Sequence, residues 1–135
     1  MQTPRFEYSR KVISDRITEL MSLKAPFGCT VRYAVKANPH LEILKMMNEG
    51  GVHFDASSEF EAMMLLQAGI AGKCISLSSQ QTANNLDELL SAGVLFVATS
   101  FKQLETFLAT KNRPGQLGVR INPVMGSGHN NRTNT

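Results

Sequence analysis

The sequence predicts an α/β protein in which short strands alternate with helices around a parallel sheet. Five short runs rich in β-branched and aromatic residues recur about every 21 residues, which leaves room for one helix and two loops per repeat. The segments between these runs carry apolar residues at helical spacing. Of the 135 residues, 42% are hydrophobic and 19% are charged, a composition typical of one globular domain.

The five expected strands are mainly apolar, as strands are when both faces of a parallel sheet are covered. They span 31–35 (VRYAV), 52–56 (VHFDA), 74–77 (CISL), 95–98 (LFVA) and 117–121 (LGVRI). The fifth run is followed by a polar tail, GSGHNNRTNT, that carries no helical pattern. We therefore expect an incomplete array of about five βα units, since an eight-unit barrel needs about 200 residues or more.

Five helices are expected, one before the first strand and one after each of the first four strands. Their apolar stripes are Ile13, Ile17, Leu20 and Met21; Leu41, Leu44 and Met47; Phe60, Met63 and Met64; Leu86, Leu89 and Leu90; and Phe101, Leu104 and Leu108. The methionines at 46, 47, 63 and 64 are interpreted as core filling and not as ligands.

Local signals agree with these helix boundaries. Residues 58–61 (SEFE) and 100–103 (SFKQ) have the capping-box pattern, in which the first and last side chains satisfy each other's free backbone N–H groups. Gly50, Gly69 and Gly93 stand where helices should end, because glycine adopts the left-handed conformation of a C-terminal cap at little cost.

Composition argues against several classes of function. The net charge is +3 and the basic residues are scattered, so no nucleic-acid partner is expected. No apolar run approaches the roughly 18 residues that span a membrane, and the N-terminus lacks a signal-peptide pattern, so a cytoplasmic location is expected. Cys29 and Cys74 form no metal or redox motif and are expected to be reduced and packed inside. The three histidines lie far apart in the sequence, and no metal site is indicated.

The chemistry is expected at the carboxyl ends of the strands, where the loops of βα barrels gather functional residues. Polar side chains follow all five strands: Lys36 and Asn38; Asp55, Ser57 and Ser58; Ser78 and Ser79; Thr99 and Ser100; Arg120 and Asn122. The lysine, the aspartate and the arginine would then face one cavity.

Several interpretations of these charged residues stay open at this point. An ammonium group is costly to bury unpaired, so Lys36 either serves as an amine nucleophile, pairs with Asp55, or reaches solvent beyond the strand. Asp55 either supports the following helix N-terminus or pairs with Lys36 or Arg120. Arg120 lies in an apolar strand, which predicts a buried partner. His129 is interpreted as an exposed loop residue.

Three segments together resemble a known family. YAVKAN (33–38), FDASSEFE (54–61) and GVRINP (118–123) occur in this order, and they are similar to the pyridoxal-phosphate-dependent decarboxylases of the alanine racemase-like fold. The opening TPRFEYSRKVISDRI is similar to the family's entry into the barrel. Within the family, the chain looks most similar to the diaminopimelate decarboxylases, with a resemblance over nearly its whole length.

The resemblance implies a partial TIM (β/α)8 barrel that binds pyridoxal 5'-phosphate and acts on a small-molecule amino-acid substrate. It implies that Lys36 forms the internal aldimine with the cofactor, and that Asp55 and Arg120 lie near the cofactor. For the diaminopimelate branch, the implied reaction is meso-diaminopimelate to L-lysine and carbon dioxide, and the implied full-length parent is a homodimer. No family role is carried over to His129.

The same resemblance implies that parts of the family's site lie outside this sequence. These are a histidine that stacks on the cofactor ring, a glycine-rich phosphate loop, an acid at the pyridine nitrogen and a second, β-rich domain. Residues 1–135 are therefore expected to form the N-terminal part of the cofactor-binding barrel and to be inactive alone. Alternatives are a fragment of an ornithine, arginine or carboxynorspermidine decarboxylase or of an alanine racemase, a non-catalytic pyridoxal-phosphate-binding protein, and a remnant without function.

Overall fold

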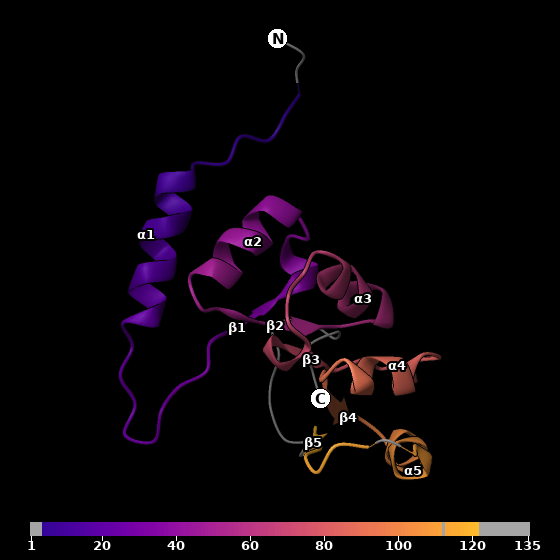
Figure 1. Cartoon of the computed structure of the whole chain (residues 1–135). Helices are drawn as coiled ribbons and strands as arrows, with labels where there is room; N and C mark the ends of the chain where they lie inside the picture. Colours follow the sequence, from indigo (N-terminus) through magenta and orange to yellow (C-terminus); the bar gives the residue numbers. More distant parts are fainter. Residues whose placement is uncertain (1–3, 112, 122–135) are drawn as a thin grey trace, which may run out of the picture.

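The structure, a computed structural model, describes residues 4–111 and 113–121. Strands and helices alternate along the chain, as expected from the sequence (Figure 1). The elements are α1 (Arg10–Met21), β1 (Arg32–Ala34), the 3-10 turn η1 (Val35–Ala37), α2 (Leu41–Glu49), β2 (His53–Ala56), α3 (Glu59–Gln67), the 3-10 turn η2 (Gly72–Cys74), β3 (Ile75–Leu77), α4 (Leu86–Ser91), β4 (Leu95–Ala98), α5 (Phe101–Ala109) and β5 (Gly118–Val119).

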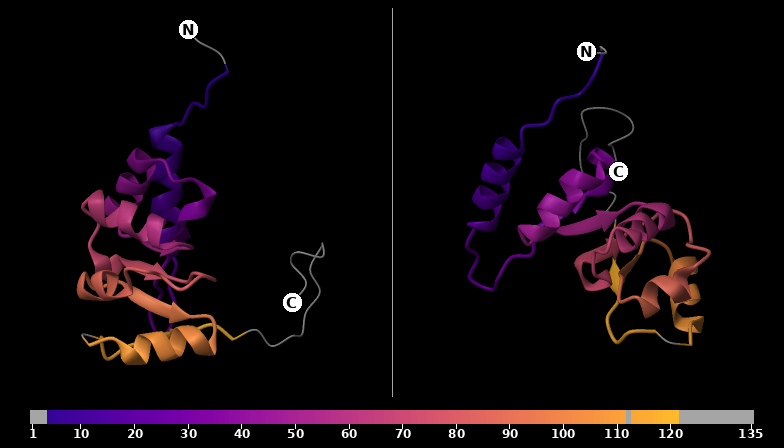
Figure 2. Two further views of the ribbon diagram at one scale, coloured as in Figure 1. Left: turned by 90° about the vertical axis from the view of Figure 1, so that its right-hand side faces the viewer. Right: turned by 45° about the horizontal axis from the view of Figure 1, so that its top comes forward.

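The five strands form one parallel sheet in the order β1-β2-β3-β4-β5. Each strand therefore pairs with the strand that follows it in the sequence. Since βα crossovers are almost always right-handed, this order puts the connecting helices on one face of the sheet. The helices α2 to α5 follow one another in an arc along that face (Figures 1 and 2). This is the wall of a (β/α)8 barrel and not a doubly wound sheet, so the predicted fold class is confirmed.

Residue alternation along the strands separates a helix side from a cavity side. Register pairs share a face, and the pairs Phe54↔Ile75 and Leu77↔Phe96 are buried under the helices. Helix side chains complete this core; they include Leu44 of α2, Leu65 of α3, Leu89 of α4 and Phe107 of α5. The next pair along the strand, Asp55↔Ser76, faces the opposite side.

Two apolar stripes were only partly right, because Met63, Met64 and Leu104 pack against the core whereas the first residue of each stripe is exposed. Phe60 is 74% exposed and Phe101 is 86% exposed, although both were expected to face the core. The buried residues are instead Ala62 and Leu65 in α3, and Gln103 and Phe107 in α5. Both phenylalanines lie in the first turn of a helix, at positions that do not face the core. A short apolar repeat predicts that a segment is helical more reliably than it predicts which side of the helix is buried.

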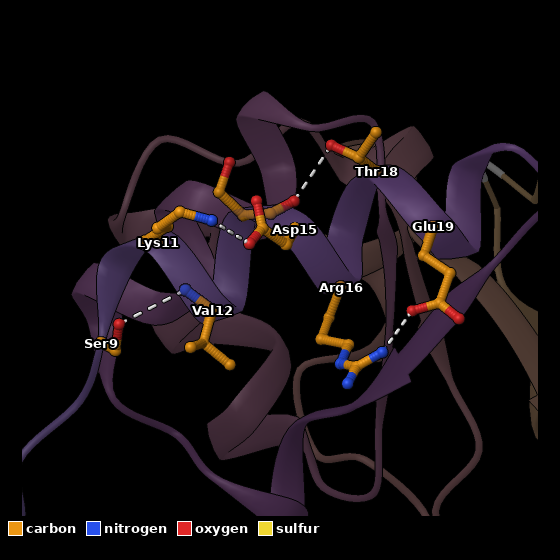
Figure 3. A network of polar contacts seen from close by, with 8 residues as sticks. Ser9, Lys11, Val12, Asp15, Arg16, Thr18 and Glu19 are labelled. Atoms are coloured by element: carbon orange, nitrogen blue, oxygen red, sulfur yellow. Dashed lines mark hydrogen bonds and ion pairs between the residues drawn. The ribbon is translucent and has the colours of Figure 1, made fainter.

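Helix α1 lies beside α2 at the edge of the sheet (Figure 2). Its polar contacts are local and exposed, and Figure 3 shows them along one helix: Lys11 Nζ lies 2.7 Å from Asp15 Oδ2, and Arg16 Nη1 lies 2.5 Å from Glu19 Oε2. Such pairs contribute about 0.3–0.5 kcal/mol each. Ile17 is the one buried residue of this helix, so its packing decides where α1 sits.

The end of α2 shows why two consecutive glycines occur there. The left-handed conformation expected at Gly50 is found at Gly51 instead, because Gly50 has φ −79° and Gly51 has φ +86°. A Cβ on Gly50 would lie 2.4 Å from Ile17 Cγ2, so Gly50 allows the close approach of α1. The expected left-handed caps at Gly69 and Gly93 are confirmed, with φ of +84° and +88°.

Two further observations concern the expectations about cysteine and membranes. Both cysteines are free, but Cys29 is exposed, so the expectation that both thiols are packed inside is wrong for that residue. Cys29 lies in the long connection between α1 and β1, and the strand pattern did not predict how this connection packs. Within 4–111 and 113–121, none of the helices is long and apolar enough to cross a membrane.

Gly72→Ala should destabilise the fold, because an added Cβ would lie 2.0 Å from the backbone oxygen of Ala92. That backbone belongs to the turn after α4, so relief requires η2 and the turn to separate. We expect a loss of about 1–3 kcal/mol in the free energy of unfolding, measured by urea titration. Gly115→Ala is the control, since a Cβ there meets nothing within 4 Å. Equal stability of the two variants would contradict the close packing.

His53 should make stability depend on pH in the acid range. Burial lowers the pKa of His53, and the charges of Arg32 and Lys73 lower it further; its Nδ1 is also buried without a hydrogen-bond partner among the described residues. The unfolded chain then binds a proton more readily than the folded chain, so stability is lost as pH falls below about 6.5. His53→Gln should reduce the change in unfolding free energy between about pH 7.5 and 5.5. An unchanged pH dependence would exclude His53 as its source.

Candidate active site

A polar cavity of about 410 Å³ lies at the carboxyl ends of β1, β2 and β3 and beside β5. Lys36, Asp55 and Arg120, the three charged residues singled out from the sequence, all line it. The rest of the lining is uncharged and polar: Ser57, Ser58, Ser78, Ser79, Gln80 and Gln81. Elements far apart in the sequence thus bring two cations and one carboxylate to a single cavity.

Lys36 lies in η1, directly after β1 ends. The preceding residue, Val35, is fully buried and anchors the turn, while Lys36 itself is exposed. No carboxylate of the described residues lies within ion-pair distance of Lys36, so the predicted structural pair with Asp55 is not present. The amine therefore reaches the cavity with no protein group bound to it in this part of the chain.

The segment after Lys36 is held by a small polar cluster. Asn38 Oδ1 accepts a hydrogen bond from the His40 backbone N–H at 3.1 Å, which closes a turn around Pro39. Asn38 Nδ2 lies 3.2 Å from Tyr8 Oη, and the rings of Tyr8 and His40 are 5.5 Å apart. These contacts turn the chain from β1 into α2 and tie the N-terminal segment to the loop that carries Lys36.

Asp55 faces the cavity from β2 and is half-buried. Its carboxylate accepts hydrogen bonds from Ser76 Oγ at 2.8 Å and from Ser78 Oγ at 3.0 Å. It forms neither of the contacts proposed from the sequence, because the described residues give it no ion pair and its hydrogen bonds come from serine hydroxyls and not from the N–H groups that begin α3. Asp55 thus places an uncompensated negative charge beside the cavity.

Arg120 follows β5, and its backbone N–H bonds to the Ala98 carbonyl oxygen at 2.9 Å. The side chain is exposed and forms no ion pair with the described residues, so the expectation of a buried partner is wrong. β5 is the last strand of the described sheet, so no described strand lies on the far side of Arg120. Its charge is available to an anion in the cavity.

Two helix caps follow β2 and β4, and the first of them lines the cavity, with one difference from the expected pattern. Ser58 Oγ accepts from the Glu61 N–H at 3.2 Å, and Ser100 Oγ accepts from the Gln103 N–H at 3.3 Å. The reciprocal acceptors, however, bind one residue earlier than in a capping box. Glu61 Oε2 accepts from the Ser57 N–H at 2.7 Å, and Gln103 Oε1 accepts from the Thr99 N–H at 2.8 Å.

Gln103 also joins two strand-end loops. It is 1% exposed, and its Nε2 donates to the Ser79 carbonyl oxygen at 2.9 Å while its Oε1 accepts from Thr99. The side chain therefore links the loop after β3 to the loop after β4. Because buried backbone groups need partners, this link sets the position of Ser79 at the cavity wall.

Sequence reasoning missed two residues here, Ser76 and Gln103. Ser76 is separated from Ser78 by one residue in an apolar strand, so both face the same side, and this spacing was an available signal. Gln103 had no comparable signal beyond its capping pattern. Asn122, His129 and the GSG segment at 126–128 lie outside the described residues.

Two other features carry none of the predicted site residues. An open groove of about 870 Å³ lies between α1 and α2, and it is lined in part by Ile17, Met46 and Gly50. No group of three or more His, Cys, Asp or Glu side chains that could hold a metal ion was found among residues 4–111 and 113–121.

Gln103→Ala should destabilise the fold more than a typical surface change, because it leaves the Thr99 N–H and the Ser79 carbonyl without their partners. We expect a loss of about 2–4 kcal/mol in unfolding free energy, measured by urea titration. Glu105→Ala, on the exposed side of α5, is the matched control and should change stability by less than about 0.5 kcal/mol. A loss no larger than that of the control would show that the two loops are held by other contacts.

Comparison with known proteins agrees with the geometry. The model of the "Pyridoxal-dependent decarboxylase, pyridoxal binding domain" family matches residues 13–135. A diaminopimelate decarboxylase of Streptomyces coelicolor is 32% identical over 139 residues, which cover 98% of this chain and 30% of that protein. One of Bacteroides thetaiotaomicron is 29% identical over 133 residues, which cover 94% of this chain and 34% of that protein.

A third relative, a diaminopimelate decarboxylase of Methanothermobacter thermautotrophicus, is 34% identical over 104 residues, 73% of this chain and 23% of that protein. The chain thus spans about a third or less of the length of these relatives. The family match itself covers nearly the whole chain. The parallel βα sheet and the lysine that it brings to a polar cavity agree with this match. The chain therefore belongs to the pyridoxal-dependent decarboxylase family, it matches the pyridoxal-binding domain of that family, and its cofactor is pyridoxal phosphate.

Proposed function

We propose that this chain is part of a pyridoxal-phosphate-dependent amino-acid decarboxylase in which Lys36 holds the cofactor covalently. The observation that carries the proposal is the cavity shared by Lys36, Asp55 and Arg120. Its volume of about 410 Å³ lies within the range of small-molecule sites, about 300–1,000 Å³.

The chemistry of the lining groups fits this cofactor. A primary amine reacts with an aldehyde, and Lys36 is the one lysine among the described lining residues. Arg120 offers a delocalised cation suited to a phosphate or a carboxylate. The serine and glutamine side chains supply further hydrogen bonds. Pyridoxal phosphate would provide the electron sink that accepts the electron pair left when carbon dioxide departs.

The residues of this chain would divide the remaining tasks. Lys36 would hold the cofactor through its Nζ, and the same nitrogen would accept or donate a proton during the reaction. Asp55 places a negative charge opposite the cations of the cavity. Arg120 attracts an anionic group at the open side. At the start of α3, Ser58 Oγ already accepts from the Glu61 N–H and Glu61 Oε2 accepts from the Ser57 N–H, so this proposal does not assign the phosphate to that helix end.

The substrate is proposed from the relatives' names. The relatives described above are named diaminopimelate decarboxylase, so we infer meso-diaminopimelate as substrate, with L-lysine and carbon dioxide as products. This would place the protein in lysine biosynthesis. We also propose, from the resemblance, that residues 1–135 form the N-terminal part of the barrel domain, and that the full-length protein is a cytoplasmic homodimer.

The test is to mix the purified chain with pyridoxal phosphate, reduce with borohydride and map the adduct by peptide mass spectrometry. We expect one equivalent of adduct on Lys36, because Lys36 alone among the lysines of the described residues lines this cavity. Lys36→Ala should lose it. Lys45→Ala is the matched control, since Lys45 is exposed on α2 and lies outside the cavity. Adduct scattered over surface lysines would contradict a formed site in this chain.

A second arm of the same experiment addresses the substrate. The chain is first loaded with pyridoxal phosphate and then mixed with diaminopimelate or with ornithine before reduction. Diaminopimelate at equal concentration should lower the trapped Lys36 adduct more than ornithine, and the mixture is analysed for lysine. Equal loss with both amino acids would contradict selectivity for diaminopimelate in this part of the protein.

A further inference from the structure

The serines of β3 and of the loop after it lie on the cavity side of the sheet. Ser76 pairs in register with Asp55, so both side chains project from the same face. Ser78 is two residues further and returns to that face. Ser76 is 3% exposed, whereas Ser78 lines the cavity. The two hydroxyl groups therefore approach Asp55 from one neighbouring strand.

The hydrogen bonds have a defined direction. An ionised carboxylate can only accept, so both hydroxyls donate to it. Ser76 Oγ lies 2.8 Å from Asp55 Oδ1, closer than its 3.2 Å distance to the Phe54 carbonyl oxygen. Ser78 Oγ lies 3.0 Å from both Oδ1 and Oδ2. Hydrogen bonds to a charged acceptor are about twice as strong as neutral ones, so they restrict rotation of the carboxylate.

The two carboxylate oxygens are not equivalent in this arrangement. Oδ1 is contacted by both hydroxyls, whereas Oδ2 is contacted by Ser78 alone. Each oxygen carries two lone pairs, so Oδ2 retains the greater capacity to accept. A cation in the cavity will therefore pair with Asp55 mainly through Oδ2.

The hydroxyls orient Asp55 without neutralising it. The described residues give Asp55 no ion pair, and Lys36 and Arg120 line the same cavity without carboxylate partners of their own. If the Asp55 carboxylate rotated freely, its oxygens would have no fixed orientation toward the cavity. The hydrogen bonds from Ser76 and Ser78 hold the carboxylate in one orientation.

We propose that Ser76 and Ser78 are positioning residues, which hold the Asp55 carboxylate so that Oδ2 is presented to the cationic groups of the cavity, Lys36 and Arg120. This proposal rests on the proposed function, because it assigns the serines an effect on the reaction of Lys36 with pyridoxal phosphate. The serines act through Asp55 and form no hydrogen bond with Lys36 among the described residues. Their removal should therefore have no effect once Asp55 has lost its charge.

The experiment is a double-mutant cycle on the full chain. The probe is the rate of borohydride-trapped pyridoxal-phosphate adduct on Lys36, measured by peptide mass spectrometry. We expect Ser78→Ala and Ser76→Ala each to change this rate about three- to tenfold, in the same direction as Asp55→Asn. In the Asp55→Asn background, the serine changes should produce no further change. Ser78→Thr, which retains the hydroxyl, should keep the rate close to that of the parent chain.

Ser91→Ala is the matched control, because Ser91 Oγ bonds only within α4 and lies outside the cavity. Urea titration of every variant separates misfolding from loss of positioning. Rates equal to that of the parent chain, or effects that add to that of Asp55→Asn, would overturn the proposal. If the serines had only a structural role, Ser78→Thr would not keep the rate of the parent chain. The effects of the serine changes on the rate would then add to the effect of Asp55→Asn.

Failure of the proposed function would be recognised separately. If the parent chain forms no selective Lys36 adduct, the cofactor role of Lys36 is wrong for this chain. The proposal about the serines is then tested by the same double-mutant cycle, with the equilibrium constant of unfolding as the measured quantity. A coupling of about threefold or more between Ser78→Ala and Asp55→Asn supports the fixed carboxylate, and independent effects overturn it.

Discussion

The parallel, in-register pairing of consecutive strands is the constraint on which the rest of this structure depends. Because β1 to β5 pair in sequence order, every crossover returns on the same side, and one face of the sheet receives all the connecting helices, α2 to α5. Residue alternation then sends Phe54, Leu77 and Phe96 into the helix-covered core. The residues between them face the other side. The same pairing aligns the carboxyl ends of the strands, and so it gathers Lys36, Asp55 and Arg120 at one cavity.

Side-chain bonds to the backbone turn this gathering into a defined geometry. The Gln103 side chain hydrogen-bonds to both Thr99 and Ser79 and so links the loops after β4 and β3. Glu61 accepts a hydrogen bond from the Ser57 N–H just before α3. Ser76 and Ser78 restrain the one carboxylate of the described cavity lining. None of these bonds is an ion pair. Within the described residues, the charges of Lys36, Asp55 and Arg120 thus remain available to a ligand.

Much of the fold could be predicted from periodicity. The strand at 95–98 has its expected bounds, and the first three strands are shorter than expected by one or two residues. The larger misses share one cause. Phe60, Phe101 and Arg120 were placed by pattern, and each is exposed in the structure. Local pattern gives the period of an element, whereas burial depends on which neighbours pack against it.

The sequence by itself determined the βα order, the helix caps and the polar residues that follow each strand, since these depend on interactions between near neighbours. It also carried the resemblance to the decarboxylase family. Only the tertiary structure decided that Asp55 bonds to Ser76 and Ser78 instead of to Lys36, and that Gly50 admits Ile17. Those contacts join residues 21 or more positions apart. Their partners are fixed by strand register and helix packing, which no local window of sequence specifies.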